Sequence, residues 1–303
     1  MVTIKRKVVQ HGPSTLTLSL PNEWVQRHGI NKGDDLLITP GHGTLQVSIS
    51  TMPKHEQKAL DVTGKLPFIE KAICAHYKAG VDDLLIHYGS GEELEQIHQS
   101  LTYGVVGWEV VEEGNTSVRV RSISTTDQRE FKVVLRRLFL SLLSVVEDGV
   151  EAARMKDYDT AKKLILRDRT INKLADVCRR IINQQGQIEY QVPTALYHIV
   201  EQLEKIGDTF KELNELLAER QLAVSRETIG QYEGVRALLR RFYDLFFAFN
   251  FNGLSAFRDE WQQLEQSFSR AAAEGEEQRF VWLLELAGRE CADLNGALMV
   301  LNF

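Results

Sequence analysis

The sequence has few cysteines and no long apolar run. Its 303 residues include three cysteines, Cys74, Cys178 and Cys291, which are too scattered for a disulfide framework or a Cys-x-x-Cys metal site. The longest strongly apolar stretch, near Leu138–Val146, is about half as long as a membrane-spanning helix requires. The N-terminal residues, MVTIKRKVV, lack the apolar core of a signal peptide. We therefore expect a cytoplasmic protein that is not integral to a membrane.

The sequence also lacks the motifs of the common enzyme classes. It has no Gly-rich phosphate loop, because Gly89-x-Gly91 only joins a predicted strand to a predicted helix. Ferritin-like metalloenzymes carry Glu-x-x-His on two helices of a bundle, whereas this chain has that spacing at Glu95–His98, outside its predicted bundle. We therefore predict that the protein is not an enzyme, and a helical-bundle metalloenzyme is the less favoured alternative.

Charge is unevenly distributed along the chain. The whole chain is 43% hydrophobic and 26% charged, and its length suits two or three domains. Residues 1–50 contain five basic and three acidic side chains, so they carry a net charge of +2, while the whole chain carries −6. The remainder therefore carries −8. A small basic segment joined to an acidic body fits a nucleic-acid-binding domain.

Residues 1–50 are predicted to form short strands and one short helix. Apolar and polar residues alternate over Thr15–Leu20, which indicates a half-buried strand. Pro21 suits the first turn of a helix that continues over Asn22–His28. Two more strands, Leu36–Thr39 and Leu45–Ile49, flank a Pro-Gly-His-Gly turn.

This order resembles the AbrB/SpoVT-type looped-hinge domain, a swapped-hairpin barrel. The resembling residues are Arg6–Val9, Gly12, Ser14–Pro21, Trp24 and Ile30–Asp34. The resemblance implies that two chains interlock in one small β-barrel, and about 45 residues bury too little surface to fold well alone. It also implies that duplex DNA is contacted by Lys5, Arg6, Lys7, His11 and Arg27. In the alternative, these side chains only solvate an edge strand and the domain only dimerises.

Residues 54–126 are predicted to form a small α/β linker domain. The pattern gives helices over residues 67–79 and 91–102 and strands over residues 84–87, 108–111 and 118–123. Ser90 and Glu93 have the spacing of a capping box, which places the start of the second helix at Gly91. No chemistry is assigned to this segment from its sequence.

Residues 127–303 are predicted to be all-α. Apolar periodicity and breaks give six helices, over about 128–155, 159–185, 193–220, 226–249, 254–274 and 277–302. Six antiparallel helices with short connections indicate two stacked three-helix bundles. The predicted fold class is therefore a multidomain α+β protein with a barrel, an α/β linker and a pair of helical bundles.

The third of these helices carries the most informative pattern. An apolar stripe is formed by Leu203, Ile206, Phe210, Leu213 and Leu217. Glu204 and Asp208 lie four residues apart on one face, where like charges repel by a few tenths of a kcal/mol unless a cation lies between them. Asp168 and Asn172 repeat the spacing on the preceding helix. The alternatives are that these acids are solvated or paired with Lys173 and Lys205.

Both segments resemble motifs of the PhoU family of phosphate-uptake regulators. LEKIGD at 203–208 resembles the acidic helix motif, and RDRTINKL at 167–174 resembles its partner, with Asn172 where the family has Asp. The resemblance covers about residues 127–303 and implies divalent or iron-type metal held by Asp168, Asn172, Glu204 and Asp208. It also implies contact with the phosphate ABC transporter or its regulators. Archaeal PhoU-like proteins carry a segment like residues 54–126 between barrel and bundle.

The second helical repeat departs from the motif. Asp259 and Gln263 match Asp168 and Asn172, but Arg289 stands where the first repeat has Glu204. A guanidinium repels a metal ion, so we expect metal only in the first repeat and a pairing of Arg289 with Asp259 or Asp293.

Together these observations predict a homodimeric regulator of phosphate uptake, with a DNA-binding head and a PhoU-like sensor body. A metal-binding helical adaptor that does not bind DNA is the alternative.

Overall fold

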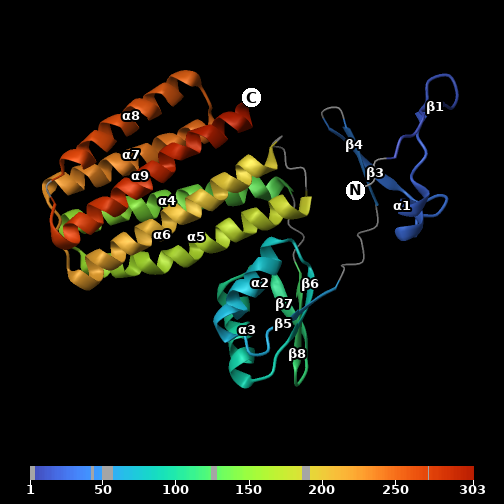
Figure 1. The fold of residues 1–303 in the computed structure, drawn as a ribbon, viewed down its shortest axis with the longest axis horizontal. Helices are drawn as coiled ribbons and strands as arrows, with labels where there is room; N and C mark the ends of the chain where they lie inside the picture. Colours follow the sequence, from blue (N-terminus) through green and yellow to red (C-terminus); the bar gives the residue numbers. More distant parts are fainter. Residues whose placement is uncertain (1–3, 42–43, 50–56, 124–127, 186–191, 272) are drawn as a thin grey trace. The chain divides into compact units, whose positions relative to one another are not determined.

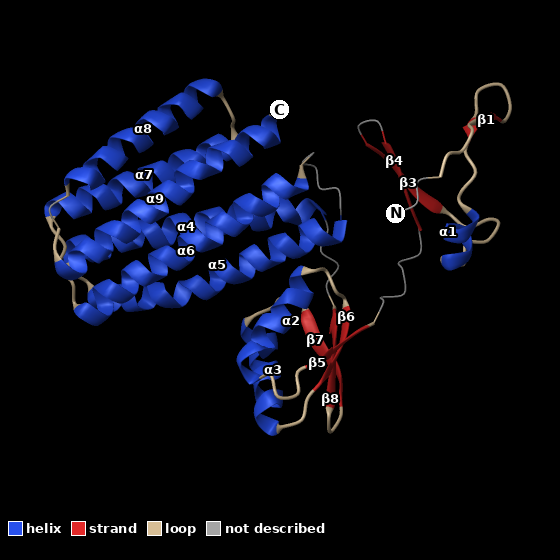
Figure 2. Cartoon of the chain, viewed as in Figure 1, coloured by secondary structure: helices blue, strands red, loops and turns tan. Residues whose placement is uncertain are grey.

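The structure is a computed structural model that describes residues 4–41, 44–49, 57–123, 128–185, 192–271 and 273–303. The chain divides into two compact units, Met1–Glu56 and Gln57–Phe303. The ribbon is shown in Figure 1, and Figure 2 distinguishes its helices from its strands. The domain boundaries predicted near residues 50–54 and 126–127, and most of the connection between residues 185 and 193, lie outside the described residues.

The first unit consists of two separate hairpins and a short helix. Its elements are β1 (Val9–Gln10), β2 (Leu16–Thr17), α1 (Asn22–Arg27), β3 (Leu36–Gly41) and β4 (Thr44–Ile49). Strand β1 pairs antiparallel with β2, and β3 pairs antiparallel with β4. None of its residues with described burial is buried.

The predicted half-buried strand at Thr15–Leu20 is wrong for the single chain. Strand β2 covers only Leu16–Thr17, and 70% of Leu16 is exposed. The alternating pattern is present, but one copy of these hairpins supplies no second layer to cover the apolar face.

The second unit begins with a four-stranded sheet and two helices. Its elements are β5 (Lys58–Asp61), the 3-10 turn η1 (Leu66–Phe68), α2 (Ile69–Lys78), β6 (Asp83–His87), α3 (Gly91–Tyr103), β7 (Trp108–Glu113) and β8 (Ser117–Ser122). The strand order is β5-β6-β8-β7, with β5 parallel to β6 and the other pairs antiparallel. Helices α2 and α3 cover one face of this sheet (Figure 2), where Ile73, Ile97 and Val118 are buried.

The capping box at the start of α3 is confirmed. Ser90 Oγ accepts a hydrogen bond from Glu93 N, and the Glu93 carboxylate accepts from Ser90 N, Gly89 N and Gly64 N. The sequence therefore located this helix from its first turn.

Beyond residue 127, the described part of the chain has six long helices. They are α4 (Gln128–Met155), α5 (Tyr158–Gln185), α6 (Pro193–Arg220), α7 (Arg226–Phe247), α8 (Phe251–Arg270) and α9 (Gly275–Asn302). All lie within four residues of the predicted bounds. Helices α4, α5 and α6 contact one another, α7, α8 and α9 contact one another, and α6 with α9 and α4 with α7 join the two sets (Figure 1). No described helix is long and apolar enough to cross a membrane.

The apolar stripe of α6 lies in the core, as predicted. Leu203, Ile206, Phe210, Leu213 and Leu217 are all buried. Because α6 contacts α4, α5 and α9, its stripe is covered on several sides, and its polar positions Glu204 and Asp208 fall at the edge of that contact.

A buried arginine connects the α/β layer, which consists of β5–β8 with α2 and α3, to the bundle of helices α4–α9. Arg180 of α5 donates from Nη1 to Tyr77 O (2.9 Å) and Val81 O (2.7 Å), and its guanidinium pairs with Asp82. It also lies over the Tyr77 ring, 4.8 Å from the centroid. Arg180 thereby donates to one carbonyl in the last turn of α2 and to one in the loop that follows it.

Candidate polar site on helices α5 and α6

The structure brings three of the four predicted metal ligands together. Asp168 and Asn172 lie on α5, Asp208 lies on α6, and these two helices pack against each other. Asn172 Nδ2 donates to Asp168 Oδ2 (3.2 Å). Burial raises the pKa of Asp208, and the nearby Asp168 carboxylate raises it further. These three residues therefore form one polar cluster, and Glu204 belongs to another.

Asp168 is almost fully buried, with 4% of its surface exposed. Its Oδ2 accepts from Lys211 Nζ (3.2 Å) as well as from Asn172. Its Oδ1 and the Asn172 Oδ1 are buried and have no hydrogen-bond partner. Unpaired buried acceptors are costly, so these two oxygens favour a cation or another donor beside them.

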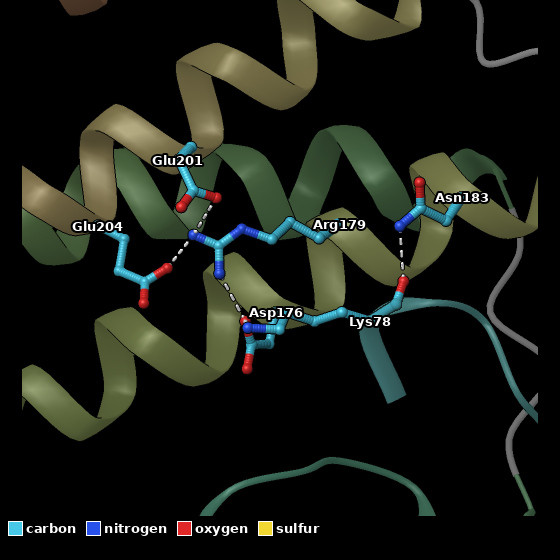
Figure 3. Close-up of polar contacts among 6 residues, drawn as sticks. All are labelled: Lys78, Asp176, Arg179, Asn183, Glu201 and Glu204. Atoms are coloured by element: carbon cyan, nitrogen blue, oxygen red, sulfur yellow. Dashed lines mark hydrogen bonds and ion pairs between the residues drawn. The ribbon is translucent and has the colours of Figure 1, made fainter. Parts of the chain in front are cut away.

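Glu204 is held by an internal cation. Arg179, of which only 2% is exposed, donates from Nη1 to Asp176 Oδ1 (2.7 Å) and pairs through Nη2 with Glu204 and, at 3.0 Å, with Glu201 (Figure 3). Asp176 also faces Lys78 Nζ, 3.8 Å away. The guanidinium thus joins carboxylates from α5 and α6.

Burial and charge oppose each other in this cluster. Burial raises the pKa of Glu204 and of Asp176 and outweighs the nearby Arg179, which acts to lower both. Arg179 itself has a raised pKa, because the three carboxylates outweigh its burial. The carboxylates of this cluster are therefore stabilised by the Arg179 guanidinium and, at Asp176, also by Lys78.

The residues present fit a metal only in part. The oxygens of Asp168, Asn172 and Asp208 are of the type that hard divalent cations prefer. Glu204 does not fit, because Arg179 already neutralises it. Within the described residues, no group of three or more His, Cys, Asp or Glu side chains is placed to hold a metal ion. The four-residue metal site stays a prediction, and its best-fitting part is the cluster of Asp168, Asn172 and Asp208.

The second repeat pairs its charges differently from our expectation. Arg289 Nη2 donates to Glu285 Oε1 (2.5 Å), one turn away on α9, and not to Asp259 or Asp293. On the same helix, Glu290 has a buried Oε2 without a hydrogen-bond partner, and burial raises its pKa.

The sequence analysis did not predict the cations that pair with the acids of α5 and α6. Neither Arg179 nor Lys211 was expected to pair with the motif acids, and Lys173 donates instead to Thr102 O (2.9 Å). One signal was available, because Arg179 and Arg180 interrupt an apolar stretch that runs to Ile182. A charged pair on the buried side of a helix indicates partners on neighbouring elements.

The predicted DNA contacts lie in the first unit and are all exposed. Lys5, Arg6 and Lys7 precede β1, His11 follows it, and Arg27 ends α1. None of the five forms an ion pair with a residue in the described part of the chain, so their charges are free for a ligand.

Comparison with protein families, with characterised proteins and with solved structures finds no match to this chain. The two resemblances therefore rest on the residues quoted for them.

We expect Arg179→Leu to destabilise the protein, and more at about pH 7.5 than at about pH 5. Loss of the guanidinium raises the already raised pKa values of Asp176 and Glu204. A carboxyl with the higher pKa in the folded state binds more protons there than in the unfolded chain, so stability falls as pH rises. Removing one partner of a buried pair costs about 3–5 kcal/mol, which urea denaturation at both pH values measures.

Arg279→Leu is the matched control. Arg279 pairs with Glu212 at the surface, so its removal should cost under about 1 kcal/mol at either pH. A loss by Arg179→Leu that is the same at both pH values would contradict the assigned role of the guanidinium.

Proposed function

We propose that the protein is a homodimeric regulator of phosphate uptake. In this proposal, residues 1–50 form an AbrB/SpoVT-like barrel between two chains and bind duplex DNA. Residues 54–126 are a small α/β domain, and residues 127–303 are a PhoU-like pair of three-helix bundles. The bundles relay phosphate status to the phosphate ABC transporter or its regulators. The observation that carries the proposal is the exposed apolar and basic surface of the first unit.

That surface supports a second copy as the partner of residues 1–50. Val9, Leu16, Leu37, Ile38 and Leu45 all lie in β-strands with more than half of their surface exposed. Several large apolar side chains exposed in one short segment indicate an interaction site, because a segment this short cannot bury them alone. Interlocking the hairpins of two chains would give each apolar face a covering layer.

We expect the wild type to have twice the mass of one chain by light scattering, and Leu16→Asp/Ile38→Asp to have the mass of one. Two carboxylates in a shared apolar core would lose their hydration without a partner. Lys32→Asp is the control, because it places a carboxylate on an exposed turn and should leave the dimer intact. A dimeric Leu16→Asp/Ile38→Asp variant would contradict the barrel.

DNA binding is expected to depend steeply on salt. Each phosphate contact from Lys5, Arg6, Lys7 or Arg27 would release condensed counterions. Replacing Arg6 and Lys7 with Ala should reduce the slope of log K against log salt by about one unit per lost contact. The control is Lys162→Ala/Lys163→Ala, two exposed lysines on α5. Fluorescence anisotropy with duplex DNA measures both, and equal slopes in the two variants would argue for an adaptor without DNA binding.

The unpaired oxygens of Asp168 and Asn172 favour the adaptor alternative as a second candidate, a metal-binding helical protein. Here a divalent or iron-type ion would bind Asp168, Asn172 and Asp208. The cation would offset the repulsion between the two carboxylates and stabilise the fold by mass action.

We expect metal content, measured by mass spectrometry, to be lost in Asp168→Ala/Asp208→Ala and retained in Asp259→Ala/Asp293→Ala. Glu204→Gln should also retain metal, because Arg179 and not a metal neutralises this carboxylate. Equal loss from both double variants would contradict the asymmetry between the repeats. A wild type that binds no iron, manganese, magnesium or zinc and shows no change in melting temperature would leave the bundle as a binding scaffold.

A further inference from the structure

A cleft of about 670 Å³ lies within the second unit, between the α/β layer and the bundle. Its walls come from α2 and α3 on one side and from α5 and α6 on the other. Small-molecule sites in proteins commonly have volumes of about 300–1,000 Å³ and lie between packed substructures. The cleft has the size and position of a ligand site, and Asn172, Asp176 and Glu204 of the two polar clusters form part of its wall.

Three basic side chains that line the cleft have no carboxylate partner among the described residues. Lys71 of α2 and Arg169 and Lys173 of α5 line the cleft, and none forms an ion pair with any residue that the structure describes. Lys173 Nζ donates to Thr102 O (2.9 Å), which orients the ammonium and leaves two of its N–H groups free. Arg169 lies over the Tyr103 ring, 5.4 Å from the centroid, so the donors at the edge of its guanidinium stay free.

The acids of the cleft do not cancel these charges. Asp176 and Glu204 are held by Arg179, and Asp176 also faces Lys78. Glu70 is the remaining lining carboxylate, and it has no ion-pair partner among the described residues. The unengaged groups are thus three cations and one anion, an excess of two positive charges that favours a multiply charged anion.

The neutral lining groups favour a flat polar ring beside that anion. Gln96 and Gln99 of α3 present side-chain amides at the cleft, with Gln96 Nε2 3.4 Å from Gln99 Oε1. Tyr103 has 56% of its surface exposed, although its ring is already in contact with Arg169. Amides recognise the edges of polar rings, and an exposed aromatic side chain offers a surface on which such a ring stacks.

We propose that this cleft binds a phosphorylated small molecule of the nucleotide class. Its phosphates would lie against Lys71, Arg169 and Lys173, and its base would lie towards Gln96, Gln99 and Tyr103. Because the cations come from both α2 and α5, the bound anion would join the α/β layer to the bundle. The ligand would then stabilise the contact that Arg180 already makes between them. The residues proposed to bind the ligand lie outside residues 1–50 and outside the cluster at Asp168, although Asn172 of that cluster also lines the cleft.

Isothermal titration of the full-length protein tests the proposal, in low salt without divalent metal. The probes are the four common ribonucleoside diphosphates, inorganic phosphate and an unphosphorylated nucleoside. We expect at least one diphosphate to bind, inorganic phosphate to bind more weakly, and the nucleoside to bind more weakly still. Binding of none of the four diphosphates, or equal affinity for inorganic phosphate, would overturn the proposal.

Variants locate the site. Arg169→Gln and Lys71→Gln remove exposed cations and should each weaken the diphosphate by about tenfold or more, the usual value of a charged hydrogen bond. Lys163→Gln removes an exposed cation from the same helix α5 outside the cleft and should leave the affinity unchanged. Thermal melting of each free variant shows that it is folded. Equal weakening by Lys163→Gln would mean non-specific attraction and would overturn the assignment.

Discussion

The second unit depends on two consecutive buried arginines. Successive residues of a helix point about 100° apart, so Arg179 and Arg180 address different neighbours of α5. Arg180 donates to the end of α2 and pairs with Asp82, while Arg179 pairs with carboxylates of α5 and α6 (Figure 3). A buried charge without a partner costs several kcal/mol, so each arginine stabilises the packing only while its partners are in place. Arg180 therefore contributes to the contact between the α/β layer and the bundle, and Arg179 contributes to the contact between α5 and α6.

Basic side chains change the electrostatics of the acidic motif formed by Asp168, Asn172, Glu204 and Asp208. A metal ion and a buried guanidinium both relieve repulsion between carboxylates, and Arg179 already does so for Glu204. Lys211 does part of this for Asp168. The motif therefore divides into a segment with its own cation and a segment, at Asp168 and Asn172, that keeps two unpaired oxygens. An added ion would find unpaired oxygens only in the second segment, so the proposed metal ligands are reduced to Asp168, Asn172 and Asp208.

The sequence patterns predicted the helices well because helix periodicity and capping depend on residues that are close together in the sequence. Apolar periodicity and chain breaks gave the six long helices, and Ser90 with Glu93 gave the start of α3. Strand β5 was missed because Lys58–Asp61 is short and pairs in parallel with β6, a contact made by a distant segment. Arg179 was missed for the same reason, since its partners on α6 lie more than twenty residues away. The predicted burial of Thr15–Leu20 was wrong because the alternating pattern shows only that one face is apolar, and no described element of the first unit covers that face.

The two units differ in the kind of side chain that is left without a partner. This difference suggests a different kind of partner for each unit. The first unit has unburied apolar side chains such as Leu16 and Ile38, and apolar area is covered by a surface of similar extent. A second copy would meet that need, because it would bring the same apolar side chains. The second unit has a buried apolar core, and its groups without partners are polar or charged, among them Lys71, Arg169 and Lys173 in a small cleft. Few charges in a confined volume are satisfied by a small ion or molecule, and this contrast is the physical basis for proposing self-association for the first unit and ligand binding for the second.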